Sequence, residues 1–261
     1  MNDERAMSST VAVVSPEMEY VPTGIKGVDE LLEGKGLPQG SISFVLGSPG
    51  SGKTTFALQF LYQGIKLWDE NAVYISLDEE IRRLKYNVKK IGLDFEPLEK
   101  ERKIAFVDAA PIRSIPGEVK LGTIAIGKRE FTLISLVDII KRNIQQVNAK
   151  RLVIDPIVAL TLQYPDESER RTSVLDLMQA VLETGVTAII TSELAQSSID
   201  RGYQFEEFLA QGVVIMRKII RSGGAVRVFT IEKMRGVEHD TQPHPYNIGK
   251  GGIEVYPNET I

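Results

Sequence analysis

The chain has 261 residues, 43% hydrophobic and 25% charged, which are the proportions of an ordinary globular protein and exclude a collagen, a coiled coil or a largely disordered chain. With 31 basic and 35 acidic residues, its net charge of −4 excludes the overall positive field of a dedicated nucleic-acid binder. Cysteine is absent and the only histidines are His239 and His244, so disulfide scaffolds, thiol chemistry and Cys/His zinc sites lack their ligands. Any bound metal is therefore expected to have oxygen ligands.

Residues 1–20 are predicted to form a flexible N-terminal tail, and residues 21–261 a single large domain. The apolar run from Thr10 to Val14 is much shorter than a membrane span, and the segment lacks the basic region and long apolar stretch of a secretory signal. We therefore expect a cytoplasmic protein that does not enter a membrane.

Strand-like and helix-like patterns alternate along most of the chain, after a short helix expected between Thr23 and Leu32. Strands are predicted at 41–46, 72–77, 104–107, 152–154 and 187–190. Helices are predicted between them, at 53–67, 81–90, 133–147 and 174–182. This alternation predicts a mostly parallel sheet covered on both faces, with ligands bound at the carboxyl ends of the strands.

Two stretches depart from this alternation. Residues 109–132 are rich in glycine and proline, and we expect an irregular functional or interface loop there. Near the end of the chain, residues 213–220 and 226–233 flank a turn at 222–224 and predict an antiparallel hairpin, followed by a last strand at 253–256.

Residues 47–54 fit the phosphate-loop pattern GxxxxGK[ST], and they lie between a predicted strand and a predicted helix. Backbone N–H groups in such a loop face phosphate oxygens, Lys53 reaches the β- and γ-phosphates and contributes to catalysis, and Thr54 is a Mg²⁺ ligand. Nucleotide binding is thus assigned to Gly47, Ser48, Pro49, Gly50, Ser51, Gly52, Lys53, Thr54 and Thr55.

Acidic residues follow two other predicted strands. Asp155 ends a buried strand, where a carboxylate can hold Mg²⁺; an aspartate before proline can also act as a turn cap. Asp78 and Glu79 follow the strand after the phosphate-loop helix, where a carboxylate can activate the water that attacks the γ-phosphate; the alternative is N-capping of the next helix.

A series of motifs in the same order resembles the KaiC branch of the RecA/RadA ATPase superfamily, over about residues 21–257. These motifs are Thr23-Gly24-Ile25, Gly36-Leu37-Pro38-Gln39-Gly40, the phosphate loop, Asp78-Glu79, Asp155, Thr191-Ser192-Glu193, Glu206-Glu207-Phe208, Lys233-Met234-Arg235-Gly236 and His244-Pro245-Tyr246. The resemblance implies an α/β fold with a RecA-like P-loop core, here 21–261, and a C-terminal antiparallel hairpin extension. It also implies slow hydrolysis of Mg-ATP bound between neighbouring subunits, usually of a hexameric ring.

The resemblance further implies roles for individual residues. The Asp78-Glu79 pair matches the residues that activate water, and Glu193 belongs to a motif at the nucleotide site. Lys233, Met234, Arg235 and His239 match the segment that reaches the neighbour's nucleotide. From spacing alone, Lys233 and Arg235 lie on the same side of a strand, which suits either a phosphate or a solvated strand end.

The sequence leaves three functions to compare. We expect a homo-oligomeric Mg-ATPase that acts as a regulator or scaffold. The alternative is a DNA-binding recombination accessory resembling RadA paralogues, but its candidate DNA loops, 161–168 and 195–204, contain only Arg201 as a cation, with Tyr164 and Tyr203 for stacking. The third is an ATP-binding switch with little turnover, against which the acidic pair argues mildly.

Overall fold

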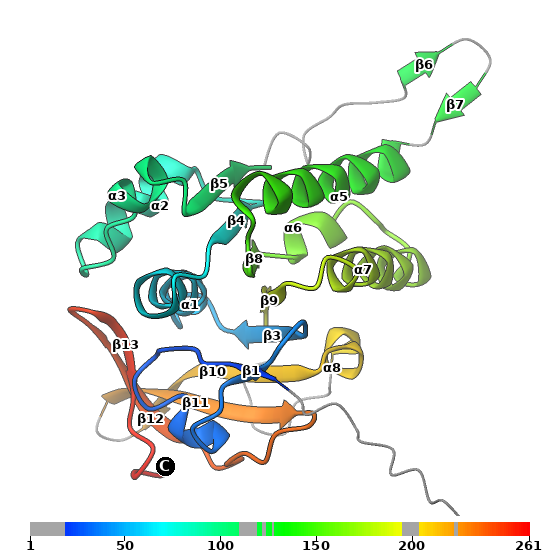
Figure 1. Ribbon diagram of the computed structural model, residues 1–261. Coiled ribbons are helices and arrows are strands. Elements are labelled where there is room, and N and C mark those ends of the chain that lie inside the picture. Colours follow the sequence, from blue (N-terminus) through cyan, green and yellow to red (C-terminus); the bar gives the residue numbers. More distant parts are fainter. Residues whose placement is uncertain (1–18, 110–118, 122–123, 127, 195–203, 222–223) are drawn as a thin grey trace, which may run out of the picture.

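In the computed structural model, the described residues are 19–109, 119–121, 124–126, 128–194, 204–221 and 224–261 (Figure 1). Their centre is a nine-stranded sheet with the order β13-β12-β11-β10-β3-β9-β8-β4-β5. Its parallel part consists of β3 (Ile42–Gly47), β4 (Ala72–Ser76), β5 (Ile104–Asp108), β8 (Arg151–Asp155), β9 (Thr187–Glu193) and β10 (Gly212–Arg221). The antiparallel part consists of β11 (Gly224–Met234), β12 (His244–Gly249) and β13 (Gly252–Val255). The predicted parallel sheet with a C-terminal antiparallel extension is confirmed.

Helices cover both faces of the parallel strands (Figure 1). On one face lie α1 (Lys53–Trp68), α2 (Ile81–Lys89) and α3 (Glu96–Lys100). On the other lie α5 (Lys128–Val147), α6 (Val158–Thr161) and α7 (Glu167–Leu182), with α8 (Phe205–Leu209) just before β10. None of the helices in these described segments combines the length and the apolar character needed to cross a bilayer.

Alternation along the strands builds a separate core on each face. In β8, Val153 packs with the α1 side of the sheet, whereas its neighbours Leu152 and Ile154 pack with α5 and α7. All three side chains are fully buried, as expected for central strands of a parallel sheet. The same alternation determines which side chains at the strand ends face α1.

The prediction of a helix from Thr23 to Leu32 is wrong except at its end, where Glu30–Leu32 form one 3₁₀ turn. Gly24 and Gly27 have φ values of 68° and 81°, which a right-handed helix does not allow. Asp29 instead closes a turn, because its carboxylate accepts hydrogen bonds from the backbone N–H groups of Thr23 and Gly24 at 2.8 and 2.9 Å. The small antiparallel pair formed by β1 (Tyr20–Val21) and β2 (Leu37–Pro38) was not expected from the sequence.

The irregular loop expected at 109–132 is also wrong in part. It contains an antiparallel pair, β6 (Val119–Leu121) and β7 (Ile124–Ile126), and α5 begins at Lys128 rather than at residue 133. Each strand has only three residues, too few for apolar alternation to stand out. Residues 110–118, 122–123 and 127 lie outside the described residues.

Arg151, the first residue of β8, is fully buried beneath α1. Its Nε and Nη2 each lie 2.6 Å from Glu70 Oε2, and Nη1 donates to the backbone oxygen of Phe60 at 3.0 Å. Gly64 leaves the space that the guanidinium fills, since a Cβ there would lie 2.2 Å from Arg151 Nε. A glycine in mid-helix is therefore required by packing.

Gly64→Ala is expected to destabilise the protein, although alanine is intrinsically better in a helix by about 1 kcal/mol. Displacing a buried, paired guanidinium adds an overpacking cost of about 1–3 kcal/mol or more, which outweighs the helix preference. Thermal unfolding measures the change. Gly249→Ala is the matched control, because no atom lies within 4 Å of a Cβ there; equal melting temperatures for the two variants would contradict the expectation.

Candidate functional site

The phosphate loop connects the end of β3, Gly47, to the first residue of α1, Lys53. Gly50 and Gly52 have φ values of 74° and 97°, which turn the chain sharply toward the helix. At Gly47 a Cβ would lie only 2.5 Å from Ser51 Oγ and from the backbone oxygen of Met216. The strand–loop–helix context expected for this motif is therefore present, and its glycines are required by backbone conformation and space.

The loop has the polar groups that phosphate oxygens require. Within the described residues, no side chain caps the N-terminus of α1, so its first N–H groups remain available. The hydroxyl oxygens of Ser48 and Ser51 are buried and make no hydrogen bond to any described residue. An anion at the start of α1 would satisfy these groups and interact favourably with the helix dipole.

Lys53 Nζ lies over this loop, donating to the backbone oxygens of Gly47 at 2.9 Å and Ser48 at 3.3 Å. Burial lowers the pKa of Lys53, while the nearby carboxylates of Asp155 and Glu193 raise it. The amine is thus anchored at the mouth of the loop and interacts electrostatically with carboxylates on two other strands.

Strand register brings those carboxylates to the same edge of the sheet. Gly47 pairs with Glu193, the last residue of β9, and Asp155, the last residue of β8, pairs with Ser76 of β4. Glu193 is exposed, whereas Asp155 is 6% exposed. The carboxyl ends of four neighbouring strands, β3, β9, β8 and β4, therefore lie at the same edge of the sheet as the phosphate loop, as expected for a parallel sheet.

Both carboxylate oxygens of Asp155 accept hydrogen bonds from buried hydroxyl groups. Tyr74 donates to Oδ2 at 2.7 Å, and Thr191 donates to Oδ1. Since each oxygen has two lone pairs, both retain capacity for a metal ion or its water ligands. Asp155 and Thr54 are a suitable oxygen set for Mg²⁺, which usually takes few protein ligands together with water and phosphate oxygens. The turn-cap alternative for Asp155 does not account for these side-chain partners.

Asp78 and Glu79 follow β4 at this edge. Asp78 is exposed and Glu79 is half-buried, and Ser76 Oγ fixes the turn by donating to the backbone oxygen of Glu79 at 2.6 Å. Burial raises the pKa of Glu79; Arg83 opposes this, and the carboxylates of Asp155 and Asp78 add to it. The N-cap residue of α2 is Glu80, with no side-chain cap bond among the described residues, so the capping alternative is not supported.

The β12–β13 hairpin supports the phosphate loop from the other side, a contact that the sequence analysis missed. Tyr246 donates a hydrogen bond to the backbone oxygen of Ser51, and a Cβ on Gly52 would lie 2.6 Å from Ile248 Cδ1. The side chain of Gln59 in α1 donates a hydrogen bond to the backbone oxygen of Ile253 at 3.1 Å and accepts one from its N–H at 2.6 Å. Only the strand order reveals this contact, since the hairpin lies almost 200 residues beyond the loop.

Lys233, near the end of β11, and Arg235, just after that strand, lie on the same side of the chain, as their spacing predicts. Lys233 Nζ donates to the backbone oxygen of Glu207, and Arg235 Nη2 to that of Phe208 at 3.4 Å, so both cations contact the end of α8. Burial lowers the pKa of Lys233, and the neighbouring Arg235 adds to that effect. Met234 points the other way and is 2% exposed.

These two cations are far from the phosphate loop of their own chain. The backbone of Arg235 bonds to Gln211, which bonds to Ile42 at the start of β3, whereas the phosphate loop follows Gly47 at its end. For Arg235, five residues of strand separate these levels by about 16 Å, more than the length of an arginine side chain. Lys233 pairs with Val213, which pairs with Phe44, so it lies three residues, about 10 Å, from the level of Gly47, and its amine is directed to α8. His239 is also outside the phosphate site; its Nδ1 lies 2.9 Å from the backbone oxygen of Val237.

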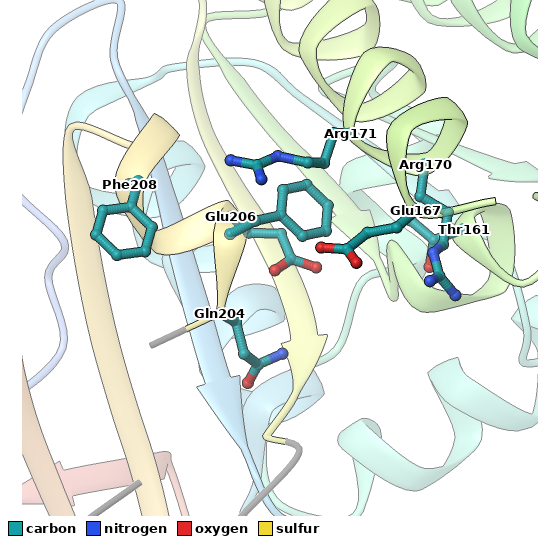
Figure 2. A pocket seen from close by; sticks show the side chains of 8 residues that line it. Thr161, Glu167, Arg170, Arg171, Gln204, Glu206 and Phe208 are labelled. Atoms are coloured by element: carbon teal, nitrogen blue, oxygen red, sulfur yellow. The ribbon is translucent and has the colours of Figure 1, made fainter. Parts of the chain in front are cut away.

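A separate pocket of about 560 Å³ lies between α7 and α8 (Figure 2). Arg170 and Arg171 of α7 line it, but the carboxyl groups of Glu167 and Glu206 face each other within it (Figure 2). The opposite charges cancel, so the pocket does not present the positive surface that DNA requires. Of the candidate DNA loop at 195–204, only Gln204 is among the described residues, and Arg201 and Tyr203 lie outside them.

The strand order, the phosphate loop after β3 and the acidic residue at the end of β8 together define a RecA-like P-loop protein. The family model described as "ATPase: KaiC" matches residues 21–260. The chain belongs to this KaiC family.

Relatives of two lengths match the chain. UPF0273 protein MJ1359 of Methanocaldococcus jannaschii is 31% identical, with 94% of this chain and 99% of that protein covered. Circadian clock protein KaiC3 of Synechocystis is 35% identical over 94% of this chain, which spans only 47% of KaiC3. The crystal structure of KaiC-like protein PH0186 of Pyrococcus horikoshii has a TM-score of 0.77 and 37% identity, covering 92% of this chain and all of that one.

Proposed function

We propose that this KaiC-family protein is a slow, Mg²⁺-dependent ATPase. The observation that carries the proposal is the meeting of the phosphate loop, Asp155 and Glu79 at one edge of the sheet. Lys53 would bind the β- and γ-phosphates, and Thr54 and Asp155 would hold Mg²⁺, which supplies charge neutralisation on the phosphate oxygens. Glu79, assisted by Asp78, would accept the proton of the attacking water.

We also propose that the nucleotide lies between neighbouring copies of the chain, in a homo-oligomer of six subunits. The side chains of Lys233 and Arg235 contact α8 rather than the phosphate loop of their own chain, yet both are cations on the same side of the chain at the end of β11. A neighbouring copy would bring them to its partner's ATP, together with His239. The family resemblance also implied Met234 there, but its side chain is buried in the core on the opposite side of the strand, so it is not part of this proposal. In this arrangement the ring would act as a nucleotide-driven regulator or scaffold in the cytoplasm.

Glu79→Gln is expected to lower ATP turnover by roughly 100-fold, the scale for loss of a positioned general base, while ATP binding is kept. The measurement is steady-state phosphate release at saturating Mg-ATP, with nucleotide affinity measured in parallel. Glu80→Gln is the matched control, because Glu80 is exposed and follows in the same turn. Parental turnover by the double variant Asp78→Asn with Glu79→Gln would show that the assignment is wrong.

A further inference from the structure

Tyr74, Asp155 and Thr191 occupy the same face of three neighbouring strands, β4, β8 and β9. Tyr74 pairs in register with Val153, so Asp155 is its diagonal neighbour, within reach of a long aromatic side chain. Ile190 of β9 pairs with Ile154 of β8, so the next residues along the two strands, Thr191 and Asp155, lie opposite each other. All three side chains face α1, the helix that starts with Lys53 and Thr54.

Two hydroxyl groups thereby hold the two oxygens of one carboxylate. The Tyr74 hydroxyl donates to Oδ2 of Asp155 at 2.7 Å, and Thr191 donates to Oδ1. Tyr74 is 1% exposed, so its hydroxyl has no access to bulk water and depends on this partner. With one donor on each oxygen from inside the protein, the carboxylate cannot rotate freely, and it still interacts electrostatically with Lys53 of the phosphate loop.

Packing alone does not explain a tyrosine at this position. The ring contacts Phe106 at a centroid distance of 5.5 Å, and a phenylalanine would make the same contact. Tyrosine differs from phenylalanine only in its hydroxyl group, and burying that group costs free energy unless it is hydrogen-bonded. It bonds to Asp155, a buried carboxylate that ends a strand at the same edge as the phosphate loop.

We propose that Tyr74 is a positioning residue for Mg²⁺: its hydroxyl holds the Asp155 carboxylate in the orientation that metal binding requires. The inference rests on the proposed function, in which Asp155 helps to hold Mg²⁺. Groups that orient a metal ligand typically contribute 10–100-fold to metal affinity or activity when they are removed. Tyr74 itself touches neither nucleotide nor metal in this proposal.

Tyr74→Phe is expected to raise the Mg²⁺ concentration for half-maximal ATP turnover about 10-fold or more. Nucleotide affinity measured in EDTA should not change, because the phosphate loop is untouched. Tyr62→Phe is the matched control: this half-buried tyrosine lies on α1, 5.3 Å from Phe95 between ring centroids. It should leave the Mg²⁺ requirement and the EDTA affinity at parental values.

A double-mutant cycle separates positioning from general destabilisation. If Tyr74 acts through Asp155, then Tyr74→Phe should weaken Mn²⁺ binding to the ADP-loaded protein, measured by electron paramagnetic resonance, but add nothing further in an Asp155→Asn background. A purely structural role would lower the melting temperature and leave this coupling at zero. Tyr74→Met is the second variant without a hydroxyl, should Tyr74→Phe not fold.

The outcomes distinguish this inference from the proposed function. A parental protein that hydrolyses ATP only with Mg²⁺, together with a Tyr74→Phe variant that behaves like Tyr62→Phe, overturns the inference alone. A parental protein without Mg²⁺-dependent turnover overturns the proposed function, and the role of Tyr74 with it. A raised Mg²⁺ requirement in Tyr74→Phe with unchanged EDTA affinity supports both.

Discussion

Lys53→Ala is expected to weaken ATP binding by roughly 10- to 100-fold, because a charged hydrogen-bonding partner of the phosphates contributes about 1.5–3 kcal/mol. Lys53 Nζ already lies at the mouth of the phosphate loop, held by the backbone oxygens of Gly47 and Ser48. In the proposed site, this change removes the positive side chain that would bind the β- and γ-phosphates. Isothermal titration calorimetry with ATP in the presence of Mg²⁺ measures the loss directly.

Lys66→Ala is the matched control for this change, since Lys66 is exposed near the end of the same helix. It removes the same charge from α1 and should bind ATP with parental affinity. A folded Lys53→Ala variant that keeps the parental affinity would refute the assignment of the phosphate loop as the nucleotide site.

Arg235→Ala is expected to lower turnover by on the order of 10³-fold, the scale of arginine fingers in phosphoryl transfer. In the proposed ring, this guanidinium stabilises charge on the γ-phosphate of a neighbouring subunit, so ATP binding by a variant's own phosphate loop should remain. Lys218→Ala is the control, because Lys218 is an exposed cation on the adjacent strand β10. It should turn over ATP at the parental rate.

Mixing two inactive variants tests whether the site is shared. In a random equal mixture of Lys53→Ala and Arg235→Ala subunits, about a quarter of the interfaces combine an intact Lys53 with an intact Arg235. Activity should therefore recover toward a quarter of the parental value once subunits exchange, which native mass spectrometry can verify. An inactive mixture with proven exchange, or full turnover by a dilute monomer, would mean that one chain contains the whole site.

The parts of the site that lie in local patterns were predictable from the sequence. The phosphate loop is eight consecutive residues between a strand and a helix, and each glycine in it has a conformational or packing reason. Asp155 and Glu79 were predictable because the carboxyl ends of parallel strands meet at one edge. Whether these residues have the assigned roles stays a prediction.

The remaining features depend on strand order and register, which apolar alternation does not specify. The contact of Tyr74 with Asp155 requires β4 and β8 to be neighbours, although 81 residues separate the two side chains in sequence. The distance of Arg235 from its own phosphate loop follows from β10 running parallel to β3 while β11 runs back. Spacing along the chain could predict a shared side for Lys233 and Arg235, but not the end of the sheet at which they lie.

The support that β12 and β13 give to the phosphate loop has a consequence for the order of events during synthesis. Ser51 and Tyr246 are 195 residues apart, and Gln59 lies 194 residues before Ile253, so the loop leaves the ribosome long before its support. A nascent chain that ends before His244 contains every residue of the phosphate motif, but it lacks the strands that pack against Gly52 and Gln59. The phosphate loop and α1 therefore fold without the contacts of Tyr246 and Ile253 during most of translation, and gain them only when the last strands are made.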